Sequence, residues 1–206
     1  AFFDAEATTP IGNIRPHVIS LLFRTLTSRP VHAVIAAHAA LKDVLSFSVV
    51  NRDNSLLHRL PKELLQTCIR PVLLNLRDYT KLSIPLLRGL SRLLSLLSSW
   101  FSNSLGEKLL DHLRKWSDPD KIISHRTWKK GEEPNVAAAI IGLFELLPDA
   151  SHFVEPLVKT TITLESVLCR FGAQFARSPS PYRAPLARYL NKHPAAVAAF
   201  FLNERR

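Results

Sequence analysis

Apolar residues recur along this sequence at the spacing of an α-helix. Within residues 82–105, Leu86, Leu90, Leu93 and Leu97 follow one another at steps of three and four, which places them on one helical face. The opposite face carries arginines and several serines, and such a polar stripe would be costly in lipid. The pattern therefore predicts an amphipathic helix that is buried on more than one flank, and not a membrane span.

The same spacing predicts helices over most of the remaining chain. Prolines stand near the start of several of them, as is common at the first helical position. No window alternates strictly between apolar and polar residues, so strands have no support. We expect about nine or ten helices, with the other apolar patterns near residues 18–26, 34–45, 65–79, 105–116, 134–147, 153–175, 184–192 and 195–203.

Three finer expectations concern single side chains. Leu21 belongs to the apolar pattern of its helix, so we expect it to face inward. Ser104 and Glu107 have the spacing of a capping box, in which Ser104 would be the N-cap of a new helix. Cys68 and Cys169 form no CxxC pair and stand near no histidine at zinc-ligand spacing. We expect both to be free thiols that are buried as small hydrophobic residues.

Prolines inside the expected helices suggest an internal repeat. Pro16 and Pro71 each follow an arginine and precede similar apolar residues, and Pro156 occupies a comparable position in a later helix. A proline within a helix bends it, which suits first helices that curve around their neighbours. Paired helices with a period of about 40 to 47 residues are typical of HEAT repeats. The larger offset between Pro16 and Pro71 would include a polar loop over residues 51–59.

Stacking of successive helix pairs would bury the apolar face that each pair leaves exposed. We therefore predict an all-α protein, an α-solenoid of HEAT-like antiparallel helix pairs, with a compact irregular helical domain as the alternative. Because the sequence contains no Met and opens on Ala1, we expect residues 1–206 to be a segment of a longer protein. The repeat-like pairs are expected near residues 11–48, 61–103, 104–147 and 150–203.

The composition argues against the common kinds of catalytic site. Hydrophobic residues make up 47% of the chain and charged residues 21%, which is enough apolar material for a core. The six glycines are isolated, so no phosphate-binding loop is encoded, and the eight histidines form no HExxH or related metal motif. We expect no enzyme activity, no catalytic residue, no cofactor, no metal ion and no small-molecule substrate.

The chain carries a net charge of +10, which suits an acidic partner, nucleic acid or a charged surface without a ligand. The basic residues are spread along the sequence, so direct nucleic-acid binding is the less favoured prediction. The polar loop over residues 117–133 combines an aromatic residue with cations that could clamp an acidic partner. Packing of the tryptophan beneath its own loop is the alternative. The candidate partner-binding residues are Arg126, Trp128, Lys129 and Lys130.

A second loop contains two serine–proline dipeptides. Ser178-Pro179 and Ser180-Pro181 resemble proline-directed phosphorylation sites, and added phosphate would change the charge of the loop and hence its docking. A rigid connector between helices is the alternative interpretation.

Three stretches of the sequence resemble a known family. LLQTCIRPVLLNLRDYTKLSIPLLRGLSRLL, residues 64–94, and LGEKLLDHLRKW, residues 105–116, carry the similarity, and RPHVISLLFRTL, residues 15–26, supports it. They are similar to the transformation/transcription domain-associated protein family, called TRRAP in animals and Tra in fungi. The similarity covers most of the chain, and residues 51–59 and 117–133 are its least diagnostic parts.

This resemblance implies a scaffold without catalytic function. The family consists of very large HEAT-repeat proteins related to phosphatidylinositol-3-kinase-like kinases, whose kinase-like domain lacks catalytic residues. They serve as the activator-binding subunit of SAGA and of a second nucleosomal acetyltransferase complex. The implied partners are other subunits of a large histone acetyltransferase complex and acidic activation domains of transcription factors, in the nucleus and with no membrane. The alternatives are a nucleic-acid-binding or a transport-receptor-like HEAT solenoid.

Overall fold

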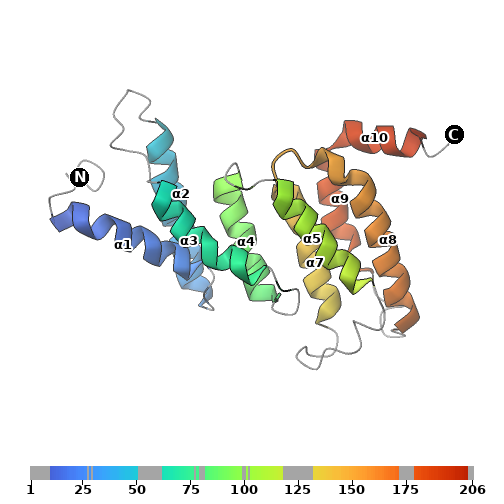
Figure 1. The fold of residues 1–206 in the computed structure, drawn as a ribbon, viewed down its shortest axis with the longest axis horizontal. Coiled ribbons are helices and arrows are strands. Elements are labelled where there is room, and N and C mark those ends of the chain that lie inside the picture. The colour runs from blue at the N-terminus through green and yellow to red at the C-terminus, as the bar shows by residue number, and fades with distance from the viewer. Residues whose placement is uncertain are drawn as a thin grey trace. The chain divides into compact units, whose positions relative to one another are not determined.

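Every element in the described part of the chain is helical, which confirms the all-α prediction (Figure 1). The structure is a computed structural model, and it describes residues 10–26, 28, 30–50, 62–76, 78, 82–98, 101, 103–117, 132–171 and 179–203. The chain divides into two compact units, residues 1–96 and 97–206. The division into helix pairs at residues 11–48, 61–103, 104–147 and 150–203 stays a prediction.

The helices agree with the apolar patterns in number and position within these residues. The first unit contains α1 (Pro10–Thr25), α2 (Val31–Val50), α3 (Lys62–Asn75) and α4 (Ile84–Leu97), which ends at the division. The second unit contains α5 (Asn103–Trp116), α7 (Glu133–Leu143), α8 (Val154–Phe171), α9 (Arg183–Lys192) and α10 (Pro194–Asn203), with short 3-10 helices η4 (Phe144–Leu146) and η5 (Ala150–Phe153).

In the first unit, α1 packs against α2 and also contacts α3. Ile19, Phe23 and Leu26 form the buried stripe of α1, and Pro16 lies inside this helix as predicted. The prediction that Leu21 faces inward is wrong, because its side chain is 62% exposed. Leu21 lies two residues from both Ile19 and Phe23, and two residues turn an α-helix by about 200°, so Leu21 points to the opposite side.

The apolar face predicted for α4 is confirmed over the helix itself. Leu90, Leu93 and Leu97 are buried, whereas Arg88 is exposed. The helix ends at Leu97, earlier than the apolar pattern does. The backbone then turns, with the N–H of Phe101 donating to the carbonyl of Ser98 at 3.1 Å. Serines favour such turns over helix interiors because their hydroxyls compete for backbone groups.

In the second unit, α5 packs against α8 and α7, and α9 packs against α7 and α8. An aromatic cluster joins η4, η5 and α9: the ring centroid of Phe144 lies 5.4 Å from that of Phe153 and 6.1 Å from that of Tyr189, both edge to face. The buried Tyr189 hydroxyl donates to the carbonyl of Ala150. Such pairs add stability beyond the area that they bury, so the cluster fixes α9 to the η4–η5 corner.

Two helix boundaries in this unit can be compared with the predicted helix ends. Pro148 and Asp149 end the predicted helix, and Asp149 adopts a left-handed conformation with φ 44°, which aspartate tolerates better than most residues. The capping-box prediction is wrong in its register. Because α5 already begins at Asn103, Ser104 lies in the first helical turn and is not the N-cap, so its spacing to Glu107 does not have the role that we assigned.

Candidate docking groove between α5 and α8

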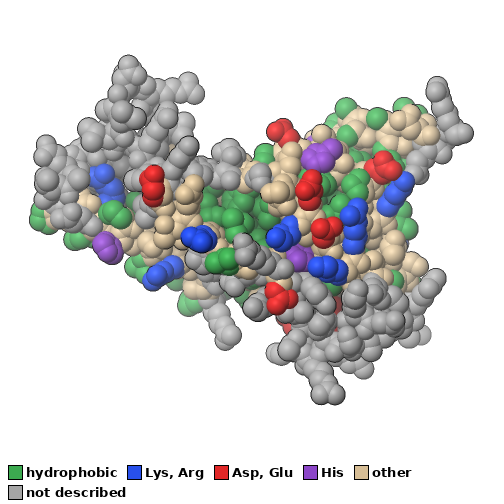
Figure 2. Space-filling model, in the orientation of Figure 1, with side chains coloured by type: hydrophobic (Ala, Val, Ile, Leu, Met, Phe, Trp, Pro, Cys, Tyr) green, Lys and Arg blue, Asp and Glu red, His purple; other side chains and the backbone are tan. Residues whose placement is uncertain are grey.

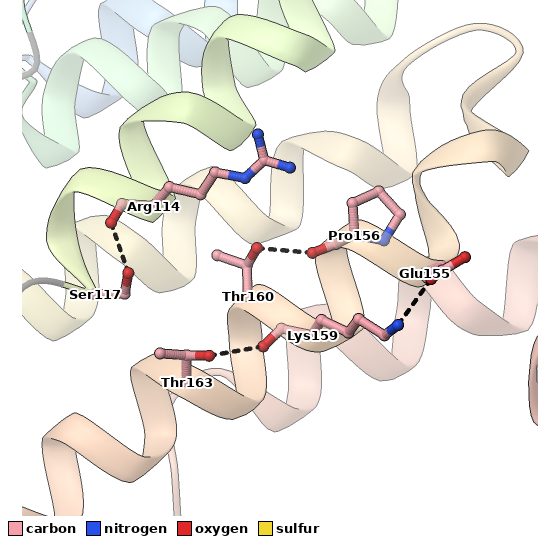
Figure 3. A pocket seen from close by; sticks show the side chains of 7 residues that line it. All are labelled: Arg114, Ser117, Glu155, Pro156, Lys159, Thr160 and Thr163. Atoms are coloured by element: carbon pink, nitrogen blue, oxygen red, sulfur yellow. Dashed lines mark hydrogen bonds and ion pairs between the residues drawn. The ribbon is translucent and has the colours of Figure 1, made fainter. Parts of the chain in front are cut away.

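A groove of about 400 Å³ lies between α5 and α8 in the second unit (Figure 3). The C-terminal end of α5 forms one wall, and the first three turns of α8 form the other. Its lining residues are Arg114 and Ser117 from the α5 side and Glu155, Pro156, Lys159, Thr160 and Thr163 from α8. Six of these seven residues are polar or charged, although carbon atoms form more of the exposed lining than polar atoms do.

The helical register explains why these side chains line the groove. On α5, Leu113 and Trp116 are buried in the core, so Arg114, one residue beyond Leu113, is turned by about 100° towards the edge. On α8, Leu157 and Leu164 are buried, and the lining residues occupy the neighbouring flank of the helix. The groove therefore follows the seam where two amphipathic faces meet.

The three hydroxyl groups of the groove each donate to a carbonyl of their own helix. Thr160 Oγ1 donates to the carbonyl of Pro156 at 2.7 Å, and Thr163 Oγ1 donates to that of Lys159 at 3.1 Å. Ser117 Oγ donates to the carbonyl of Arg114 at 2.6 Å. A hydroxyl that has used its proton keeps lone pairs that can accept hydrogen bonds. The groove thus presents acceptors to N–H groups of an incoming chain.

Each cation of the groove is paired with an acid on its own helix. Lys159 Nζ lies 2.8 Å from Glu155 Oε1, and Arg114 Nη1 lies 3.4 Å from Asp111 Oδ1. All four side chains are more than half exposed, and exposed helix pairs of this kind are worth only about 0.3–0.5 kcal/mol. A partner carboxylate can therefore replace either acid at little cost.

The visible face of the second unit has a mixture of charges, with Lys and Arg side chains interspersed among Asp and Glu (Figure 2). Two further pairs belong to this unit: Arg183 Nη2 lies 2.7 Å from Glu165 Oε1, and Arg188 Nε lies 3.2 Å from Glu145 Oε2. This interspersion differs from the basic patch that is typical of a nucleic-acid face.

The site residues predicted from the sequence lie elsewhere. Arg126, Trp128, Lys129 and Lys130 fall outside the described residues, so the prediction of an acidic-partner loop there stays a prediction. Ser178 also falls outside them. Ser180 is described: it is half-buried, and its Oγ accepts a hydrogen bond from the backbone N–H of Tyr182 at 3.3 Å.

The α5–α8 groove was missed because its two walls lie about 40 residues apart in the sequence, beyond the reach of any local pattern. The signal that could have drawn attention to it is the threonine-rich stretch over residues 159–163 on an otherwise amphipathic helix. Threonine is a modest helix former. A cluster of threonines within a helix therefore indicates that this flank has a role other than stabilising the helix.

Burial changes the pKa of several groups in the described residues. It raises the pKa of the Tyr189 hydroxyl, and burial followed by the charge of Glu165 raises the pKa of Tyr182. Burial also raises the pKa of the half-buried Cys68 thiol. The prediction that both cysteines are buried is wrong for Cys169, which is exposed because it lies on the outer flank of α8.

Among the residues that the structure describes, no group of three or more His, Cys, Asp or Glu side chains is placed to hold a metal ion. None of the helices in this part of the chain combines the length and the apolar character that crossing a membrane requires.

Comparison with known proteins assigns the chain to a family. The family model described as the Tra1 HEAT repeat ring region matches residues 2–206. The "Probable transcription-associated protein 1" of Dictyostelium discoideum is 37% identical over 91% of this chain, and the "SAGA complex/NuA4 acetyltransferase complex subunit TRA1" of Saccharomyces cerevisiae is 35% identical over 95%. The human "Transformation/transcription domain-associated protein" is 25% identical over 92%.

This chain spans only 4% or 5% of the length of these relatives. Since the family model covers a region of HEAT repeats and nearly the whole chain, the predicted HEAT-repeat architecture is confirmed. The chain belongs to the Tra1/TRRAP family, as a segment of its HEAT repeat ring region.

Proposed function

We propose that this chain is a non-catalytic scaffold segment of a SAGA- and NuA4-type acetyltransferase complex, and that it acts in the nucleus. The observation that carries the proposal is the match of the HEAT ring model to residues 2–206. Two yeast relatives, from Saccharomyces cerevisiae and Schizosaccharomyces pombe, are named as subunits of the SAGA complex and of the NuA4 acetyltransferase complex. HEAT arrays present long surfaces for partners, which fits a scaffolding role.

Within this role, the α5–α8 groove docks acidic segments of transcription activators or of neighbouring subunits. Arg114 and Lys159 supply the positive charge, and their exposed pairing with Asp111 and Glu155 is weak enough to be exchanged. The hydroxyl acceptors of the groove would bind backbone N–H groups of the same segment. Charge complementarity of this kind accelerates encounter and fixes the register of a partner.

The test changes the groove in the full-length protein within its assembled complex. The double variant Arg114→Glu with Lys159→Glu reverses both cations. The matched control is Lys42→Glu with Lys108→Glu, which makes the same change in net charge at exposed lysines outside the groove. The measurements are subunit composition, capture of an acidic activation segment, binding of duplex DNA, and acetylation of free histones.

We expect the groove variant to reduce capture by about tenfold or more, whereas the control retains it. Acetylation of free histones should be unchanged in both, because this segment contributes no catalytic group. Equal loss in both variants would show a general charge effect and contradict the groove. Unchanged capture in the groove variant would also contradict docking in the groove. If the groove variant lost duplex DNA binding and kept capture, a nucleic-acid role would be favoured instead.

A further inference from the structure

Helix α10 is apolar on all sides, and none of its residues is buried. Its sequence, PAAVAAFFLN, contains no charged side chain. Phe201 and Leu202 are 50% and 65% exposed. A helix that is hydrophobic all round is normally buried. The described part of this chain therefore does not give α10 the burial that such a helix normally has.

One side of α10 packs against the described helices of the second unit. Ala196, Val197 and Phe200 are half-buried where α10 contacts α8 and α9. The Phe200 ring stacks edge to face on Phe201 at 5.0 Å, and Lys159 Nζ lies 6.0 Å from the centre of the Phe200 ring. In Figure 1, α10 runs across the ends of the α8 and α9 helices.

The other side of α10 has the pattern of a helix-packing seam. Ala195, Ala198, Ala199 and Leu202 are all exposed and stand at positions i, i+3, i+4 and i+7, which share one helical face. Three of the four are alanines, whose small side chains let the backbone of a second helix approach closely. The seam therefore has the shape and the chemistry that fit another helix with an apolar face.

Membership of a HEAT-repeat family indicates what covers the outer face of α10. In HEAT arrays each unit buries its apolar face against the next unit, and a unit at the end of an array needs a polar outer face. The outer face of α10 has none, and about 95% of the length of the yeast relative lies outside the match. We propose that the outer face of α10 is covered by an apolar-faced helix of an adjacent HEAT repeat of the same full-length polypeptide.

The second unit thus has two surfaces with different roles. The groove remains open to other proteins, whereas the outer face of α10 is closed by the scaffold itself. Because Phe200 lies beneath Lys159, a covering helix on α10 would also fix the position of one groove cation. The inference rests on family membership and on the α10 seam, and it stands even if the groove binds no activator.

The first experiment places a photo-crosslinking amino acid at Leu202 in the full-length protein within its assembled complex. The control places the same group at Asn191, an exposed polar position on α9. We expect Leu202 to crosslink to a peptide of the same polypeptide outside residues 1–206, identified by mass spectrometry, and to do so well above the control. Crosslinks to a different subunit would overturn the proposal, and so would a yield no higher than that of the control.

The second experiment compares Leu202→Lys with Asn191→Lys in the same full-length protein. Replacing a leucine that is buried in an interface destabilises the interface. The equilibrium constant for local opening should then rise by about tenfold or more. We therefore expect amide exchange in α10 to accelerate about tenfold or more in Leu202→Lys and to stay unchanged in Asn191→Lys. Equal exchange rates in the two variants would overturn the proposal, because an uncovered Leu202 would lose nothing.

Discussion

Replacing Gly106 by alanine is expected to destabilise the second unit, whereas the same change at Gly142 is expected to stabilise it. A Cβ atom at Gly106 of α5 would lie 2.5 Å and 2.6 Å from two ring carbons of Phe153, Cε2 and Cζ. At Gly142 of α7 the nearest atom, Cβ of Pro185, would lie at 3.6 Å, an ordinary van der Waals distance. Gly106 is thus the residue that lets α5 approach the η5 corner.

The magnitude depends on whether Phe153 can move. Its side chain is only 3% exposed, and its ring is held by Phe144 at 5.4 Å and by His152 at 3.9 Å between ring centroids. Overpacking of a fixed core costs about 1–3 kcal/mol. Within a helix, alanine is more favourable than glycine by about 1 kcal/mol of folding free energy. At Gly106 this gain offsets part of the overpacking cost, and at Gly142 it is the only effect that we expect.

We therefore expect Gly106→Ala to lower the free energy of unfolding by up to about 2 kcal/mol and Gly142→Ala to raise it by about 0.5–1 kcal/mol. Urea unfolding of the 206-residue chain, followed by far-UV circular dichroism, measures both values. Because the two substitutions are chemically identical, the comparison isolates the space around each Cβ atom. If Gly106→Ala were as stable as Gly142→Ala, the close approach of α5 to Phe153 would be refuted.

Three other predictions follow from the second unit and the cysteines. Tyr189→Phe should lower the free energy of unfolding by about 1–3 kcal/mol, measured by urea denaturation, because the buried Ala150 carbonyl loses its donor. Burial and then the charge of Lys192 lower the pKa of His193 below 6.5, so the folded state binds its proton less readily than the unfolded state. This contribution to the free energy of unfolding should be fully present above pH 6.5 and be lost as the pH drops through the lowered pKa. In urea titrations at several pH values, His193→Asn should make the free energy of unfolding depend less on pH. Iodoacetamide at neutral pH should modify the exposed Cys169 before the half-buried Cys68, whose pKa is raised. Peptide mass spectrometry measures the two rates, and equal rates would contradict the partial burial of Cys68.

Most of the helices could be predicted from the sequence because their apolar residues recur at steps of three and four, as in an amphipathic helix. Leu109, Leu113 and Trp116, within the apolar pattern predicted near residues 105–116, are all buried in α5, and α9 and α10 begin within one residue of the predicted positions. Periodicity did not determine which of two apolar stripes faces inward. In α1 the stripe through Ile19 and Phe23 faces inward, and Leu21 does not, because the choice depends on where α2 and α3 lie.

The candidate site was harder to predict because it is a tertiary feature. Arg114 and Lys159 stand on helices that are far apart in the sequence, and each looked like an ordinary surface cation. A composition of mixed charge does not show which cations face a common groove. The apolar character of α10 was visible in the sequence, but its lack of buried residues emerged only from the packing.

The most direct test of the scaffold account is a density map of the assembled full-length complex with an acidic activation segment bound. The account predicts additional density along the α5–α8 groove, in contact with Arg114 and Lys159. Density for the bound segment elsewhere on the complex, with the groove empty, would contradict it.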